Sequence, residues 1–564
     1  MAKFSNAQKF PLLAQTLSMD RRAFLLRAGA MGLSLVAFEA LLAACNTPNA
    51  SITATPIGSN TAPAAPQATT TPTPVLAPTA TPNPIPQPTT TPTQVTQPIS
   101  TPTSIPQPTT TPTHVPSPTP TPIAILQPSP ILSSERVRIG HLLRRAGFGA
   151  RQEDYDKFLA MGLDATVDYL LDYDSVDNSA LESRLASLDL DMEKGSQLKQ
   201  WWLIRMIYTE RPLQEKMVLF WHGILTSSYK KGGSLFMHVQ NELFRKHALD
   251  NYDVLLKAVS RDPAMLNWLD SKRNKKRAPN ENYSRELMEL FTMGIGHYTE
   301  EDVRESARAF TGWGLLKGEF RFNPKDHDNL SKRFLGKTGD FHGDDIVDII
   351  LEHPATGDFI ARELFSFFAY DDPEPEIIQS LAATFQTSKY SMKAVMRQIL
   401  TSPAFYSEKA YRAKIKSPSE LVAGTVRSLG IETDGKPLSR WTEIMGQVLF
   451  APPDVSGWDG GETWINSTTL LQRLNFVNLI SANSNKRLPF DPVKLLPQDS
   501  PSLTEAGLEY FPKLLLDENM APEEQQVLQA YLTTLDARVG SLMNNEKLKS
   551  LIYLVMASPE FQLA

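Results

Sequence analysis

The chain has 564 residues, among them 43 prolines and a single cysteine, and its formal net charge is −6. One cysteine excludes an internal disulfide and a multi-thiolate zinc site, and the slight acidity offers no electrostatic footprint for nucleic-acid binding. The composition changes sharply near residue 133, so the parts before and after that point belong to different structural classes.

The first 45 residues have the features of a secretory signal. Arg21 and Arg22 are followed by Ala23-Phe24-Leu25-Leu26, which resembles a twin-arginine export motif, and an apolar stretch covers residues 28–44. A transmembrane anchor is the alternative, but the stretch is short for a membrane span and contains one glutamate. We therefore predict export by the twin-arginine route.

The apolar stretch ends in Leu42-Ala43-Ala44-Cys45, which resembles a lipobox. A lone cysteine is often a buried thiol, but this one precedes a segment that has no core for it to join. We expect Cys45 to carry a lipid that anchors the protein on the extracytoplasmic face of the membrane or at the cell surface.

Residues 46–133 form a linker of Thr, Pro, Ala, Gln and Ser, in which Thr-Pro recurs every ten residues from Thr71 to Thr121. Such a composition buries too little apolar surface to fold, and its prolines favour an extended chain. The linker is thus predicted to be a disordered tether, with or without sugars on its threonines.

Residues 134–564 are predicted to form one large, mainly α domain with at most a small β-hairpin. Apolar residues recur there at helical spacing, in ranges 198–208, 213–225, 235–249, 281–292, 300–311, 359–368, 419–429 and 470–481. Thr299 and Ser417 are expected helix caps, the latter followed by Pro418 and Glu420. The expected hairpin pairs residues 319–322 with 333–335.

Several segments of this domain together resemble DUF1800, a large bacterial family of unknown function. They are residues 141–149, 220–222, 262–266, 279–294, 298–303, 310–313, 327–328, 416–421, 452–458 and 464–467. The resemblance implies a helical, exported protein, and it implies an exported sulfatase-like partner. Phe291 stands where many members have histidine, and Gly223 stands where asparagine is usual.

One helical face within the longest of these segments is the main candidate site. Asn282, Glu286 and Glu289 follow one another at spacings that place them on one side of a helix, where they could bind a divalent metal ion or move a proton. The alternative is structural: Glu281 and Arg285 form an i, i+4 pair, and Glu286 or Glu289 bonds an arginine such as Arg304 or Arg308. Both interpretations stay open.

His222 and His327 are the candidate imidazole ligands for such a site, which would then suit Mn, Fe or Zn. Each is also compatible with an ordinary hydrogen-bonded histidine. Zincin, serine hydrolase, nucleotide-binding and dinucleotide-binding motifs do not occur in the sequence.

The loop of residues 452–464 brings Trp458 and Trp464 close to Gly460 and Gly461. Exposed, these tryptophans would stack on sugar rings; buried, they would complete the core. The sequence thus supports two functions: a surface enzyme acting on an envelope or extracellular polymer through Glu286 and Glu289, or a non-catalytic module that binds a cell-envelope glycan or an exported protein.

Overall fold

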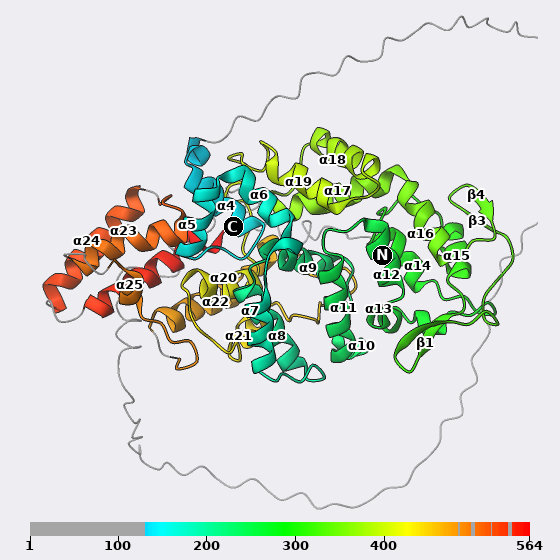
Figure 1. The fold of residues 1–564 in the computed structure, drawn as a ribbon, viewed down its shortest axis with the longest axis horizontal. Coiled ribbons are helices and arrows are strands. Elements are labelled where there is room, and N and C mark those ends of the chain that lie inside the picture. The colour runs from blue at the N-terminus through cyan, green and yellow to red at the C-terminus, as the bar shows by residue number, and fades with distance from the viewer. Residues whose placement is uncertain (1–129, 483–484, 498–501, 521, 540–543) are drawn as a thin grey trace, which may run out of the picture. The chain divides into compact units, whose positions relative to one another are not determined.

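The computed structural model describes residues 130–564, apart from 483–484, 498–501, 521 and 540–543 (Figure 1). All of the described residues belong to one compact unit of the chain. The predicted export signal, Cys45 and nearly all of the predicted tether lie outside the described residues. The first described element, η2 (Pro130–Ser133), ends where the sequence predicts that the helical domain begins.

Helices make up most of the described chain, so the predicted mainly α class is confirmed. The first group is α4 (Glu135–Arg145), α5 (Gln152–Met161), α6 (Leu163–Leu171), η3 (Tyr173–Ser175), α7 (Ser179–Ser187), α8 (Gly195–Tyr208), α9 (Pro212–Ile224), α10 (Tyr229–Gly232), α11 (Ser234–Lys246), α12 (Tyr252–Ser260), α13 (Pro263–Trp268) and η4 (Ser271–Arg273). The middle group is α14 (Asn282–Glu289), α15 (Glu300–Ala309), β1 (Trp313–Leu316), β2 (Glu319–Phe322), β3 (Lys332–Phe334), β4 (Lys337–Gly339), α16 (Gly343–Glu352), α17 (Pro354–Phe368), α18 (Pro375–Thr387) and α19 (Met392–Thr401). The last group is α20 (Pro418–Ser428), α21 (Leu438–Ile444), η5 (Gly461–Trp464), α22 (Ser467–Ser481), η6 (Pro492–Leu495), α23 (Leu503–Leu516), α24 (Pro522–Val539), α25 (Asn544–Ala557) and α26 (Pro559–Gln562).

Both helix caps expected from the sequence are present. Thr299 Oγ1 accepts the Asp302 amide at 3.2 Å, and the Asp302 carboxylate accepts the Thr299 amide at 2.9 Å. At α20 the Ser417 hydroxyl accepts the Glu420 backbone amide, and the Glu420 carboxylate accepts the Ser417 backbone amide. These capping boxes satisfy amides that the first turn of a helix otherwise leaves unpaired, which fixes where α15 and α20 begin.

The strands form two hairpins rather than the single predicted one. β2 pairs with β1, and β3 pairs with β4, so the predicted pairing of residues 319–322 with 333–335 is wrong. Each hairpin closes through two residues with positive φ, Lys317-Gly318 and Leu335-Gly336. Two such residues make the tight turn whose twist matches antiparallel strands, so each strand pairs with its immediate neighbour.

The core is rich in large aromatic side chains. Trp221 on α9 stacks on Tyr252 with ring centroids 5.4 Å apart, and the Trp221 indole donates to the Ala248 carbonyl at 3.0 Å. The Tyr252 hydroxyl donates to the carbonyl of Phe291 at 2.5 Å, and the Phe291 side chain is fully buried. Phe291 is therefore a packing residue, at a position where the sequence resemblance suggested that relatives have histidine.

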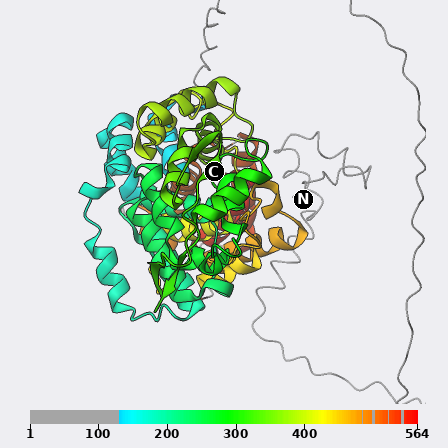
Figure 2. The ribbon, with the colours of Figure 1, turned by 90° about the vertical axis from the view of Figure 1, so that its right-hand side faces the viewer.

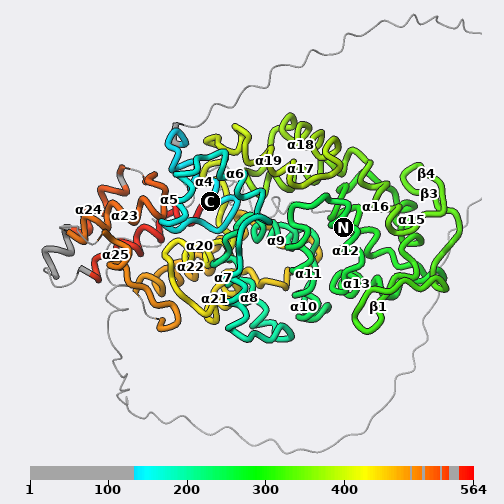
Figure 3. Tube along the Cα trace, viewed as in Figure 1, coloured from blue at the N-terminus to red at the C-terminus, as the bar shows by residue number. Residues whose placement is uncertain are grey.

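The last described segment returns to the first helices. The Arg136 guanidinium on α4 donates to the carbonyl of Lys513 on α23, and Lys414 exchanges backbone hydrogen bonds with Ala564. Figure 3 shows this return as a Cα trace, and Figure 2 shows the ribbon after a quarter turn. Among the described helices, none is both long and apolar enough to cross a bilayer.

Candidate functional site

A cleft with a volume of about 370 Å³ lies against α9, α17 and the start of α20. Small-molecule sites typically have volumes of a few hundred Å³ and combine apolar walls with a few polar groups. The residues lining it are Arg145, Leu219, Phe220, Gly223, Ile224, Glu363, Ser366, Phe367, Asp371, Lys414, Ile415, Ser417, Glu420, Gln447, Trp458, Asp459, Gly460, Gly461 and Trp464. The cleft is thus large enough for a sugar-sized ligand and is lined by both aromatic and charged side chains.

The cleft brings together segments that are far apart in the sequence. Arg145 ends α4, Phe220 lies on α9, Ser417 caps α20, and Trp458 belongs to the loop before α22. Each of these residues comes from one of the sequence segments that carry the family resemblance. The longest such segment, residues 279–294, contributes no residue to the cleft lining.

The two predicted tryptophans lie differently in the cleft wall. Trp464 is 7 % exposed, so it mainly completes the core, as the structural alternative expects. Trp458 is half-buried and meets the ring of His222 edge-on, with centroids 5.5 Å apart. Trp458 is therefore the aromatic side chain of this loop that is available to a ligand in the cleft.

Two carboxylates that line the cleft, Glu420 and Asp371, are each paired with a lysine. The buried Lys216 ammonium forms an ion pair with Glu420, and Lys414 Nζ lies 2.5 Å from Asp371 Oδ1. Burial raises the pKa of Glu420, but Lys216 and Arg145 outweigh it and lower that pKa to about 2. Glu420 is thus a carboxylate at neutral pH and holds the lysine of α9 against the start of α20.

The predicted carboxylate face lies on α14. Glu286 and Glu289 are half-buried, while Asn282 is exposed. Burial and the neighbouring Glu289 raise the pKa of Glu286, and the Tyr298 hydroxyl donates to Glu289 Oε2 at 3.1 Å. The raised pKa of Glu286, beside a second carboxylate on the same helix, is compatible with proton transfer.

The arginines near α14 are engaged elsewhere. Arg285 pairs with Glu281, as expected, and also with Glu300 at 2.8 Å. Arg304 pairs with Glu301, and Arg308 pairs with Glu305 and Asp328. Neither arginine named in the structural alternative therefore bonds the carboxylate of Glu286 or Glu289 in the described part of the chain.

The two predicted histidine ligands are enclosed by other rings. His222 is 1 % exposed, and its ring lies near those of Trp202, Phe450 and Trp458. Burial lowers the pKa of His222 to about 3, so its imidazole is neutral. His327 stacks on His342 with centroids 4.4 Å apart, and its Nδ1 donates to the Thr311 carbonyl at 2.8 Å.

Over residues 130–564, gaps aside, no three His, Cys, Asp or Glu side chains gather in a way that could hold a metal ion. The predicted ligand set of His222, Asn282, Glu286, Glu289 and His327 is thus not assembled as one site, because neither histidine joins both carboxylates. The reason is tertiary: each imidazole packs into its own aromatic cluster, away from the face that helical spacing gives to α14.

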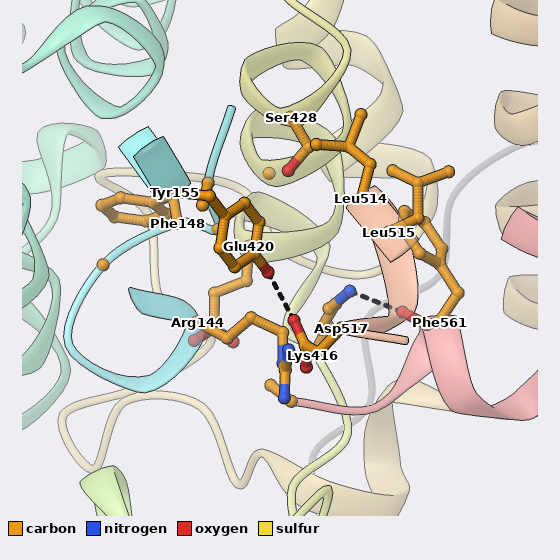
Figure 4. Close-up of a pocket in the computed structure, with 15 residues that line it drawn as sticks. Arg144, Phe148, Tyr155, Lys416, Glu420, Ser428, Leu514, Leu515, Asp517 and Phe561 are labelled. Atoms are coloured by element: carbon orange, nitrogen blue, oxygen red, sulfur yellow. Dashed lines mark hydrogen bonds and ion pairs between the residues drawn. The ribbon is translucent and has the colours of Figure 1, made fainter. Parts of the chain in front are cut away.

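A second, much smaller pocket, drawn in Figure 4, shares the lining residue Glu420 with the cleft. Its volume is about 30 Å³, which is room for one or two water molecules. Arg144 forms an ion pair with Asp517, Tyr155 donates to the same carboxylate at 2.5 Å, and Lys416 Nζ donates to the Phe561 carbonyl at 2.6 Å. These charges tie α4 to the last helices and leave no space for an organic ligand.

The model of the family of unknown function DUF1800 matches residues 141–563. The chain belongs to the DUF1800 family. The match covers the helical domain from its first helix to its last, and so includes every segment that meets at the cleft. No curated protein and no solved structure matches this DUF1800 chain.

The polar residues of the cleft were not predicted as functional residues from the sequence. Arg145, Ser417 and Glu420 stand inside segments that carry the family resemblance, but by spacing alone they are helix-end and capping residues. Lys414 and Asp371 stand outside those segments. Only the packing of α4, α9, α17 and α20 makes these residues neighbours.

Proposed function

We propose that this DUF1800 protein is an exported, lipid-anchored surface protein whose helical domain binds a cell-envelope or extracellular glycan in the cleft beside Trp458. The observation that supports it is Trp458 itself, a half-buried tryptophan on a cleft of about 370 Å³ that is otherwise lined by many polar and charged groups. Aromatic faces stack on the C–H faces of sugar rings, while polar groups bind their hydroxyls.

The proposed location rests on the sequence before the helical domain. Arg21 and Arg22 would direct export, and Cys45 would carry the lipid. Replacing Cys45 with serine is expected to release the exported protein from the membrane fraction, and replacing both arginines with lysine is expected to keep it in the cytoplasm. A Cys45→Ser protein that stays in the membrane fraction would argue against lipidation at this residue.

Binding is tested by titrating the purified chain with oligosaccharides and following tryptophan fluorescence and heat. Trp458→Ala is expected to weaken binding about five-fold or more, because one aromatic stacking contact contributes roughly 1 kcal/mol or more. Trp441→Ala is the matched control, since Trp441 is also half-buried but packs on Phe476 away from the cleft lining. Equal loss in both variants, or no binding by the wild type, would contradict the proposal.

A second candidate function is acid–base or metal-assisted catalysis on an envelope polymer through Glu286 and Glu289. The raised pKa of Glu286 and the absence of an arginine bonded to either carboxylate in the described chain favour it. Metal content of the native protein, compared with a folded Glu286→Gln, Glu289→Gln double variant, tests this candidate. Stoichiometric metal that is lost in the variant would support it, and no metal in either protein would leave only proton transfer.

The exported sulfatase-like partner that the resemblance implies is the alternative ligand of this domain. Its binding would be expected to survive Trp458→Ala if it uses a different face of the domain. Co-purification of the wild type and this variant with the exported neighbour separates the two.

A further inference from the structure

Arg145, the last residue of α4, contributes a buried guanidinium to the lining of the cleft. Its side chain is 2 % exposed, and it is among the largest fully buried side chains of the protein. Nε donates to the Phe368 carbonyl at 3.0 Å, and Nη2 donates to the Phe367 carbonyl at 2.5 Å. Within the part of the chain that the structure describes, Nη1 has no hydrogen-bond acceptor, and Arg145 lines the cleft.

Two lysines at the cleft have carboxylate partners, Lys216 behind the lining residue Glu420 and Lys414 in the lining itself, but Arg145 does not. Lys216 pairs with Glu420, and Lys414 pairs with Asp371. No carboxylate of the described residues lies within ion-pair distance of Arg145, so these three cations share two carboxylates. An unpaired buried charge is costly, and burial accordingly lowers the pKa of Arg145 to about 10.

A second buried arginine shows that the lack of a carboxylate partner does not by itself mark an arginine as a ligand-binding residue. Arg473 is fully buried, and it too lacks an ion pair in the described chain. Its guanidinium donates to the Lys416 carbonyl at 2.7 Å and to Gln562 Oε1 at 3.3 Å, and it does not line the cleft. Arg145 differs because it combines an unused donor with access to a ligand-sized space.

We propose that Arg145 binds an anionic group of the ligand, so that the cleft takes an acidic glycan, one whose sugar units carry a carboxylate, phosphate or sulfate. This inference rests on the proposed glycan-binding function and narrows its ligand class. A guanidinium presents planar donors that match such groups, and its hydrogen bonds to anions are stronger than neutral ones. Trp458 would hold the sugar ring while Arg145 holds its charge.

The other acidic residues of the lining are compatible with this arrangement. Asp371 and Glu420 are each neutralised by a lysine, and the charges that act on Arg145 are chiefly those of Glu420, Arg144 and Asp371. Glu363 on α17 and Asp459 on the tryptophan loop are the other carboxylate residues of the lining.

The test compares matched oligosaccharides on the whole chain: a neutral oligomer, its uronic-acid counterpart and its phosphorylated counterpart. The acidic oligomers are expected to bind about ten-fold or more tightly than the neutral one, since a charge-assisted hydrogen bond contributes roughly 1.5 kcal/mol or more. Comparison of the uronic and phosphorylated oligomers identifies which anion is preferred. Added salt is expected to weaken the binding of the acidic oligomers and to leave the binding of the neutral oligomer unchanged.

Arg145→Gln is expected to abolish the preference for acidic oligomers, measured as the ratio of the acidic to the neutral affinity in the same variant. Arg145→Lys is the charge-retaining comparison and is expected to keep part of the preference. Because Arg145 also bonds two carbonyls of α17, a variant that fails to fold is replaced by competition on the wild type. Inorganic phosphate should then displace the acidic oligomers and not the neutral one.

Each outcome separates this inference from the proposed function. Equal affinity for neutral and acidic oligomers would overturn the role of Arg145 while glycan binding stands. An acidic preference that survives Arg145→Gln would also overturn it, because the anion then binds elsewhere. Failure of every oligomer to bind would overturn glycan binding itself.

Discussion

The backbone of Gly457 lies so close to the carbonyl oxygen of Gly223 that a Cβ at position 457 would clash with it. Gly457 also has a φ of 83°, and the neighbouring Thr226 hydroxyl donates to the Val455 carbonyl. These contacts hold the tryptophan loop against the end of α9. The position of Trp458 in the cleft therefore depends on the lack of a side chain at Gly457 and on the backbone at Gly223, more than two hundred residues away.

Gly457→Ala is expected to lower the free energy of unfolding by roughly 2 to 3 kcal/mol, because the side chain meets both a left-handed φ and a backbone oxygen. Gly461→Ala is the control, since Gly461 has a φ of 55° but nothing near its missing Cβ. Gly461→Ala should lower the free energy of unfolding by about 1 kcal/mol. Thermal unfolding measures both, and equal costs would show that the close approach to Gly223 carries no energy.

Gly223 lines the cleft, and a Cβ built on it meets no atom within 4 Å. Gly223→Ala is expected to raise the free energy of unfolding by about 0.5 kcal/mol, because alanine loses less backbone entropy in a helix than glycine. Gly223→Leu is expected to fill the cleft and abolish ligand binding without unfolding the domain. Calorimetric titration of the two variants checks this, and a leucine variant that binds as the wild type would place the ligand elsewhere.

Asp262 caps α13 from a buried position. Its Oδ2 accepts the Met265 amide at 2.9 Å and the Gln240 amide at 2.8 Å, while Oδ1 has no partner in the described chain. Burial raises the pKa of Asp262 to about 7, from an ordinary value near 4. The folded protein therefore keeps a proton that the unfolded chain releases, and this contribution to stability is full below about pH 4 and lost as the pH rises to about 7.

Asp262→Asn is accordingly expected to stabilise the domain at pH 8 relative to the wild type, by roughly 3 to 4 kcal/mol more than at pH 4. The asparagine oxygen can take both accepting bonds, and its amide replaces the unpaired oxygen. Urea unfolding of both proteins across this pH range is the measurement. A stability difference that does not change with pH would contradict the raised pKa.

Glu215 and Arg245 form a fully buried, two-point ion pair, with Nε to Oε1 at 2.5 Å and Nη2 to Oε2 at 2.9 Å. Glu215→Gln is expected to cost roughly 3 kcal/mol, because it removes the buried counter-charge of Arg245 and leaves that arginine only its pair with the exposed Glu242 at 2.9 Å. Glu432→Gln removes the exposed pair with Arg184 and should cost less than about 1 kcal/mol. Similar costs in chemical denaturation would mean that the buried pair is screened by water.

Local features of this chain were predictable because they depend on near neighbours in sequence. The apolar spacing and the caps at Thr299 and Ser417 predicted helices that the structure contains, and the predicted pair of Glu281 and Arg285 is present. The hairpin partners were predicted wrongly, since the turn residues Lys317-Gly318 and Leu335-Gly336 carry more weight than the alternation of apolar residues. A lysine or leucine with positive φ gives no signal in the sequence.

The sequence by itself determined the helical class, the family and the face that Glu286 and Glu289 share on α14, because helical periodicity and capping act over a few residues. Only the tertiary structure decided which charges are paired and which polar groups meet. It separated His222 and His327 from those carboxylates, and it brought Arg145 to the same cleft as Trp458. Burial and counter-charges depend on how distant helices pack, and no spacing along the chain encodes that packing directly.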